Sequence, residues 1–384
     1  MAKRLVNWDL LRTLAMFFVV MVHSSQYLGS IHGIETAPFI SEFALICDPI
    51  FFVLSGFFAF RPLKTTYAKY LLNKVVTIVL PLVVYSVILY AYGCVKGTVA
   101  FGLPQYFNWF YGTLFGGWWF IPALIPFLVL APFLYTMFEA LSDSQCKLLM
   151  KVVALFALWG ALCTVLQWVS TLTGIGSLNT LPGLLSGLIP TEPIPGGYFM
   201  YFCLGYFIHK MPSLYSTEFL KRIAVLGIAG WLLGAVAAIV GYVRSDPSYL
   251  WLFASVGIFL IFDKIQIIGE RASRVINWTA KRSYSIYLLQ YTTIAIVFGV
   301  FNQFGMLDGT ANMAFWIRIP LQVIAVSLSW LLALGIASIV DSFILEPIQN
   351  VCKARAVNTM LSVVLGKGWL LAIPGLIPNS AICF

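Results

Sequence analysis

Four ionisable side chains fall within or at the ends of long apolar segments of this sequence: Arg12, His23, Asp48 and Arg318. Because a titratable group is costly inside a hydrocarbon core, such residues are candidates for function. Arg12 and His23 are 11 residues apart, so one helix would place both on the same face with about 16 Å between them. Asp9, three residues before Arg12, can pair with the guanidinium on that face.

General base catalysis is the chemistry that suits His23. A neutral imidazole can take a proton from a hydroxyl group and pass it to a departing thiolate. A histidine in a membrane can also serve only to hydrogen-bond a neighbouring helix, and Arg12 on the same face favours the catalytic interpretation. Asp48 has two equally weighted interpretations: it orients the imidazole or stabilises its protonated form, or it caps a helical segment that begins at Pro49.

The composition places these residues in a membrane. The chain has 384 residues, of which 61% are hydrophobic and 10% are charged, against roughly 25% charged in ordinary soluble domains. Apolar runs of about 20 residues, long enough to cross a hydrocarbon core about 30 Å thick, recur along it. The sequence predicts an all-α, polytopic bundle of about ten transmembrane helices over residues 1–347, followed by a cytoplasmic or interfacial tail, 348–384. The predicted helices cover residues 8–28, 39–60, 72–93, 118–138, 148–171, 194–210, 220–243, 249–268, 283–303 and 314–345.

The basic residues predict the orientation of the bundle. With the N-terminus in the cytoplasm, all Lys and Arg residues fall on the cytoplasmic side except four: Lys96 and Arg244 outside, and Arg12 and Arg318 within helices. Cytoplasmic loops of membrane proteins carry this excess of positive charge. We therefore expect both termini inside, in a multi-pass protein of the cell (plasma or inner) membrane. The net charge of +9 then reflects orientation, and we expect membrane lipid as a partner and no nucleic acid.

Several motifs follow one another along the chain. Arg12 precedes His23 by ten intervening residues, residues 51–56 read FFVLSG, and residues 283–290 read SYSIYLLQ. Together with the ten-helix layout, these motifs resemble those of the acyltransferase 3 family over about residues 8–347. Three further segments, Trp118–Pro122, Leu204–Tyr206 and Glu346–Pro347, occur in the expected order.

The resemblance implies a membrane-bound O-acyltransferase of cell-surface glycans. Such an enzyme moves an acetyl or other short acyl group from cytoplasmic acyl-CoA to a hydroxyl of an extracytoplasmic glycan or lipid-linked saccharide. It implies a catalytic role for His23 and a donor-binding role for Arg12. Supporting positions in or beside the motifs are Asp9, Ser55, Tyr284 and Glu346. The chain departs from the family where it has Lys74 and Thr77 in place of Arg-x-x-Arg, and where it has Gln290 in place of His.

We expect acetyl-CoA or another acyl-CoA to be the donor substrate. We expect no tightly bound cofactor. The seven cysteines lack C-x-x-C spacing, which argues against a zinc site, so we expect no metal. The phosphates of CoA need cations, for which Arg is geometrically suited. Four basic residues at predicted cytoplasmic positions could supply them, although each also fits as a membrane anchor: Lys69, Lys74, Lys281 and Arg282.

The outer side offers candidates for binding the acceptor. Arg318 holds an anionic group of a substrate or extends outward to the membrane surface, and the second interpretation is favoured. Trp118 and Trp119 stack on a sugar or belong to the aromatic belt of the membrane interface, again with the second favoured.

Two other classes of protein remain open. A transporter could use Arg12, His23 and Asp48 as a pathway for protons or substrate, and a catalytically inactive relative could bind a partner. The enzyme would release CoA from acyl-CoA, whereas the transporter would move a solute without changing it.

Overall fold

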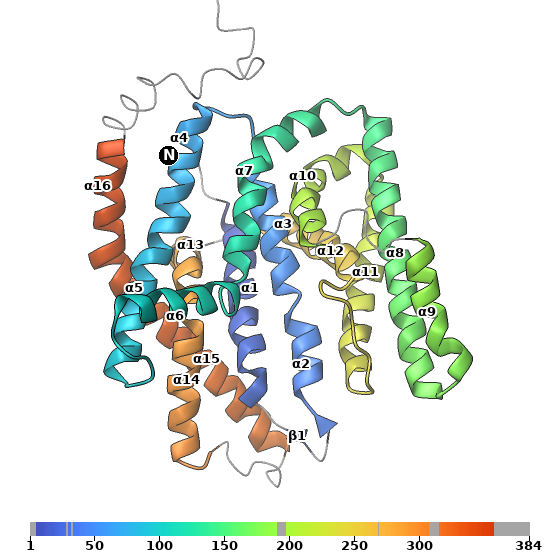
Figure 1. Cartoon of the computed structure of the whole chain (residues 1–384). Coiled ribbons are helices and arrows are strands. Elements are labelled where there is room, and N and C mark those ends of the chain that lie inside the picture. The colour runs from blue at the N-terminus through green and yellow to red at the C-terminus, as the bar shows by residue number, and fades with distance from the viewer. Residues whose placement is uncertain are drawn as a thin grey trace, which may run out of the picture.

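The computed structural model describes residues 5–27, 30–31, 34–189, 197–267, 269–306 and 315–356. These residues form helices apart from connections and two paired strands of two residues, β1 (Ser30–Ile31) and β2 (Ile34–Glu35). The all-α prediction is therefore confirmed. The helices of Figure 1 are α1 (Val6–Ser24), α2 (Ala37–Ala44), α3 (Cys47–Ala59), α4 (Tyr67–Lys74), α5 (Leu80–Val95), α6 (Leu103–Phe115), α7 (Phe120–Glu139), α8 (Asp143–Thr173), α9 (Gly176–Leu188), α10 (Tyr198–Leu214), α11 (Thr217–Ala238), α12 (Trp251–Lys264), α13 (Glu270–Lys281), α14 (Ser283–Gln303), α15 (Phe315–Val340) and α16 (Glu346–Ala356).

Eight helices or continuous helical runs of the described residues are long and apolar enough to cross a membrane. Two further predicted spans exist as helices, but α10 has 17 residues and α12 has 14, fewer than the roughly 20 that cross a bilayer perpendicularly. The chain is thus a multi-pass membrane protein, and the count of ten and the orientation stay predictions. Helices α4 and α16 lie at one end of the bundle, and β1 and the end of α14 lie at the other (Figure 1).

The second predicted span is not one continuous helix. It divides into α2 and α3, which begins at Cys47 with Ile46 as its N-cap. Asp48 therefore lies in the first turn of α3 and makes no capping hydrogen bond. The interpretation of Asp48 as the cap of a helix starting at Pro49 is wrong. The carboxylate still lies where the partial positive charge of a helix N-terminus favours it.

The α5–α7 connection forms a helix, α6, which lies across the bundle instead of along it (Figure 1). Gly102 precedes α6 with a φ of +157°, and Gly116 and Gly117 follow it in a turn that leads into α7. This turn brings backbone from the α6–α7 connection against α14, where Tyr287 Oη donates to the carbonyl oxygen of Gly117 at 3.2 Å.

Two glycines let α3 and α10 cross in close contact. A Cβ atom on Gly56 would collide with the carbonyl oxygen of Phe202, and one on Gly205 would collide with the backbone of α3 at Val53 and Phe57. Small residues at such crossings allow helix backbones to approach, which favours packing between membrane helices. The FFVLSG and Leu204–Tyr206 motifs therefore hold this crossing together.

The SYSIYLLQ motif anchors the start of α14. Ser285 Oγ donates to Asp341 Oδ1 at 2.7 Å, and Tyr85 Oη donates to the same oxygen at 2.8 Å. Tyr284 Oη donates to the carbonyl oxygen of Ile78 at 2.9 Å. Ile78 and Asp341 belong to two π-helical turns, η2 (Val75–Val79) and η4 (Asp341–Leu345). The motif thus connects α14 to the α4–α5 run and to the end of α15.

Replacing Gly56 with Ala should destabilise the folded protein by about 1–3 kcal/mol, because the added methyl group overpacks the α3–α10 crossing. The apparent melting temperature in detergent, measured by tryptophan fluorescence, should fall by roughly 5 °C. Gly335→Ala is the matched control, since a Cβ at Gly335 in α15 would meet nothing within 4 Å. Equal melting temperatures for the two variants would contradict the assigned role of Gly56.

Candidate active site

Helix α1 carries the predicted polar pair at its first turns. Arg12 Nη1 lies 3.0 Å from Asp9 Oδ1, so the predicted ion pair is confirmed. Asp9 is buried and its carbonyl oxygen accepts from Thr13 Oγ1 at 2.9 Å. The carboxylate therefore orients the guanidinium, and the Arg12 side chain remains 27% exposed and accessible to a ligand.

His23 lies in the last turn of α1 and contacts Tyr291 of α14. Tyr291 Oη is 2.9 Å from His23 Nδ1 and 3.3 Å from Nε2, with the ring centroids 4.6 Å apart. The two residues are separated by 268 positions in the sequence. Nothing in the sequence marks Tyr291 as a site residue except its position directly after the SYSIYLLQ motif.

The turn before α7 supports Tyr291. A Cβ atom on Gly117 would lie 2.7 Å from Cε2 of the Tyr291 ring, so only glycine lets the ring pack this closely against the backbone. Tyr287, one helical turn before Tyr291, holds the same turn through the carbonyl oxygen of Gly117. Gly117 and Tyr287 together fix the Tyr291 ring beside His23.

Asp48 faces the same group of residues from α3. Its carboxylate is close enough to Tyr198, Tyr287 and Tyr291 for its charge to act on all three phenols. Cys47 Sγ donates to Asp48 Oδ1 at 3.5 Å. The structure thus brings α1, α3, α10 and α14 together around His23 and Tyr291, with one carboxylate nearby.

A network of charged side chains lies next to this group; Arg244 and Glu42 are largely enclosed, and Asp246 is exposed. Arg244 Nε is 2.9 Å from Glu42 Oε2, with only 13% and 6% of the two side chains exposed, and Arg244 Nη1 is 3.4 Å from Asp246 Oδ1. Tyr198 Oη donates to Asp246 Oδ1 at 2.7 Å. The guanidinium also lies 4.5 Å from the ring centre of Trp251. Arg244, predicted as an outer-loop cation, therefore joins the α11–α12 connection to α2 and α10.

Two arginines share one aromatic ring at the other end of the α1–α3 pair. The guanidinium carbons of Arg12 and Arg61 each lie 5.4 Å from the ring centre of Phe58. Arg61 follows directly after α3 and is exposed. Sequence analysis counted Arg61 among the cytoplasmic cations without assigning it to the donor, because its nearness to Arg12 depends on the packing of α1 against α3.

The other predicted donor cations lie elsewhere. Lys69 and Lys74 are on α4, where Lys69 is exposed and Lys74 Nζ lies 5.2 Å from the ring centre of Tyr70. Lys281 is exposed at the end of α13. Arg282 is buried, stacks on Trp278 at 4.4 Å and donates to its carbonyl oxygen at 2.9 Å. These contacts give Arg282 a packing role at the α13–α14 junction.

Of the residues predicted to bind the acceptor, Arg318 lies in the core, whereas Trp118 and Trp119 lie beside the site. Arg318 is only 2% exposed, so the prediction that it extends outward is wrong; it is enclosed by neighbouring helices. Trp118 is 1% exposed and lines a cavity beside Tyr291. The Trp119 ring lies tilted against the Tyr198 ring, with the centroids 5.2 Å apart. Both tryptophans therefore adjoin the group around His23.

The remaining motif residues support the helices. Tyr284 makes the contact with Ile78 described above. Ser55 is half-buried within α3, and Glu346 is exposed at the start of α16. The predicted domain boundary at residue 347 falls within α16, and residues 357–384 of the predicted tail lie outside the described residues. No group of His, Cys, Asp and Glu side chains suited to a metal ion occurs among the described residues.

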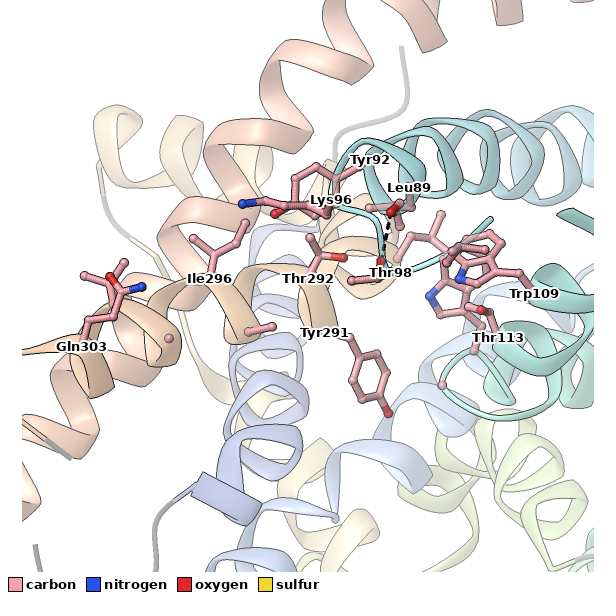
Figure 2. A pocket seen from close by; sticks show the side chains of 18 residues that line it. Leu89, Tyr92, Lys96, Thr98, Trp109, Thr113, Tyr291, Thr292, Ile296 and Gln303 are labelled. Carbon is pink, nitrogen blue, oxygen red and sulfur yellow. Dashed lines mark hydrogen bonds between the residues drawn. The ribbon is translucent and has the colours of Figure 1, made fainter. Parts of the chain in front are cut away.

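A cavity of about 810 Å³ opens beside Tyr291, between α5, the α6–α7 segment and α14. Figure 2 shows Lys96 and Thr292 on one side of it and Trp109 and Thr113 on the other, with Tyr291 extending away from them. The Tyr291 hydroxyl reaches His23, so the cavity adjoins the candidate base. A second cavity, of about 380 Å³ between α7, α8 and α10–α12, is lined almost entirely by apolar side chains.

Long apolar helices that enclose a histidine, a tyrosine and a carboxylate define a multi-pass membrane protein with a polar site inside its bundle. The profile of the acyltransferase 3 family, described as an acyltransferase domain, matches residues 5–334. The chain therefore belongs to this family and is a membrane acyltransferase. No curated protein and no solved structure matches it.

Proposed function

We propose that this protein is an O-acyltransferase of the cell membrane. It transfers an acetyl or other short acyl group from cytoplasmic acyl-CoA to a hydroxyl of an extracytoplasmic glycan or lipid-linked saccharide. The observation that carries this proposal is the 2.9 Å contact between His23 Nδ1 and Tyr291 Oη. This contact lies at the opposite end of α1 from the Arg12–Asp9 pair. The cation that would bind the donor and the base therefore lie at different depths.

The Tyr291 contact bears on which imidazole nitrogen acts as the base. A neutral imidazole has one N–H donor and one nitrogen acceptor. If Nδ1–H donates to Tyr291 Oη, then Nε2 keeps its lone pair and can accept a proton. The phenol hydrogen of Tyr291 is then available to another acceptor.

Transfer then proceeds in two balanced steps. The acceptor hydroxyl loses its proton to His23 Nε2 while its oxygen forms a bond to the thioester carbonyl carbon. The carbonyl oxygen becomes an oxyanion, to which the Tyr291 hydroxyl is a suitable donor. Collapse of this intermediate breaks the carbon–sulfur bond, and the imidazolium returns the proton to the departing thiolate. The products are the acylated acceptor and free CoA.

Arg12 and Arg61 suit the phosphates of the donor. Two guanidinium groups beside one ring, Phe58, offer several N–H donors in planar arrays, which match phosphate oxygens. Asp9 orients Arg12, and Arg61 has an exposed side chain. This chain lacks one of the cations that the family has in its Arg-x-x-Arg motif, and Arg61 can supply it. The distance of about 16 Å along α1 then suits the extended pantetheine arm of CoA.

Replacing His23 should abolish the transferase reaction. In purified protein supplied with labelled acetyl-CoA, both His23→Ala and His23→Gln should lower CoA release by about 10²–10⁴-fold, since general base catalysis contributes that much. Glutamine retains hydrogen-bonding capacity toward Tyr291, so it separates loss of the base from loss of packing. Proton-coupled uptake of a solute into liposomes without CoA turnover would instead establish a transporter.

Tyr291→Phe should keep the ring against Gly117 and remove only the hydroxyl. We expect kcat to fall by about 10²–10³-fold with KM for acetyl-CoA nearly unchanged, because one hydrogen-bond donor to the oxyanion is lost. Tyr206→Phe is the control, since it removes a hydrogen bond of similar length, 2.6 Å to Glu139, away from His23. Unchanged kcat and an unchanged pH profile in Tyr291→Phe would contradict its role.

Arg61→Ala should weaken binding of the nucleotide part of the donor. KM for acetyl-CoA should rise about tenfold, in line with the loss of a hydrogen bond to a charged group. KM for acetyl-pantetheine, which lacks the nucleotide, should not change. Lys64→Ala removes another exposed cation three residues along the same segment and should have no effect. An equal rise in KM for both donors would show that Arg61 acts on the fold and not on phosphate.

A further inference from the structure

The cavity beside Tyr291 has walls from three parts of the chain. Residues of α5, of the α6–α7 segment and of α14 line its volume of about 810 Å³, which is within the size range of small-molecule binding sites. On α14 the lining follows one helical stripe, from Tyr291 through Thr292 and Gly299 to Gln303. A ligand in the cavity would therefore extend along α14 and end at Tyr291, whose hydroxyl contacts His23.

The lining of the cavity combines aromatic rings with polar side chains that form no hydrogen bond within the described residues. Trp109 and Trp118 line one side, and their rings lie 6.1 Å apart and nearly perpendicular. The side chains of Thr113, Thr292 and Gln303 make no hydrogen bond to other described residues. Aromatic faces with hydroxyl and amide groups suit a hydroxyl-rich ligand that also has apolar faces, which is the chemical character of a saccharide.

Lys96 gives the cavity its charge. It is the only charged side chain among the described residues that line the cavity, and no carboxylate lines it. Of the two cations predicted on the outer side, Arg244 is held by Glu42 and Asp246, whereas Lys96 forms no ion pair within the described part of the chain. A cation without a counter-ion in a cavity attracts anions and favours ligands that carry one.

We propose that this cavity binds the acceptor saccharide and that Lys96 selects acceptors carrying an anionic group, either a carboxylate or a phosphate. The identification of the ligand as the acceptor rests on the proposed function. The anion would lie at Lys96 and the sugar between the tryptophans and α14. A hydroxyl at the Tyr291 end of the cavity would meet His23. The anionic group is a sugar carboxylate or the phosphate of a lipid-linked saccharide.

Binding to the full-length protein in nanodiscs tests this site without requiring turnover. Two matched pairs of probes distinguish the sources of the anion. One is trigalacturonate against its fully methyl-esterified form, and the other is decyl-phosphate-linked N-acetylglucosamine against decyl N-acetylglucosaminide. At least one anionic probe should bind about tenfold more tightly than its neutral counterpart, which corresponds to about 1.4 kcal/mol. The pair that shows the difference identifies the source.

Variants assign the preference to Lys96. Lys96→Ala should remove the tenfold difference while leaving the affinity for the neutral probe within about twofold, and Lys96→Arg should retain the difference. Lys221→Ala, which removes an exposed cation at the start of α11, should bind as the wild type does. Equal affinity of the wild type for both members of both pairs, absence of binding, or equal losses for charged and neutral probes in Lys96→Ala would overturn the proposal.

Donor turnover separates this proposal from the proposed function. CoA release from acetyl-CoA is measured with water as the acceptor and again with each saccharide probe, in the wild type and in His23→Ala. Selective anion binding with no CoA release under any of these conditions would uphold the site and refute the acyl-CoA mechanism. CoA release that depends on His23, without charge selectivity in binding, would uphold the mechanism and refute the role of Lys96.

Discussion

The site depends on the hydrogen bond between His23 on α1 and Tyr291 on α14. A polar side chain within an apolar bundle needs a partner, and this one comes from a helix near the other end of the sequence. Gly117 lets the Tyr291 ring approach the turn before α7, and the α14 motif fixes its helix through Asp341 and Ile78. Three separate regions thus position one phenol against one imidazole.

Helix α1 provides the second constraint, because its length separates the Arg12 guanidinium from the His23 imidazole. Arg12 is held by Asp9 near its start, and His23 lies in its last turn. Between them the helix buries apolar side chains, including Ala15, Met16, Val19 and Val20, which limit the access of water. One helix therefore holds a guanidinium and an imidazole at fixed, different depths, which is what the proposed transfer from a cytoplasmic donor to an extracytoplasmic acceptor requires.

Local spacing predicted what lies within one helix, and tertiary packing determined the rest. The Asp9–Arg12 pair follows from a three-residue separation on α1, and the apolar runs predicted most of the spanning helices. Tyr291 is 268 residues from His23, and Arg61 meets Arg12 only because α1 packs on α3. Hydropathy also could not show that Arg318 is enclosed or that the second span breaks before Asp48, since both depend on neighbouring helices.

The residues near Tyr291 form two groups that differ in their charged side chains. In the first group Arg244 forms ion pairs with both Glu42 and Asp246, and Asp48 lies within range of the charges of Arg244 and Asp246. The cavity along α14 has Lys96 and no carboxylate among its described lining residues. An anion is thus attracted to the α14 cavity, where Lys96 has no counter-ion among the described residues, more than to the group in which Arg244 is already paired. This uneven distribution of charge favours an anionic ligand in the α14 cavity, which is the physical basis of the proposed acceptor site.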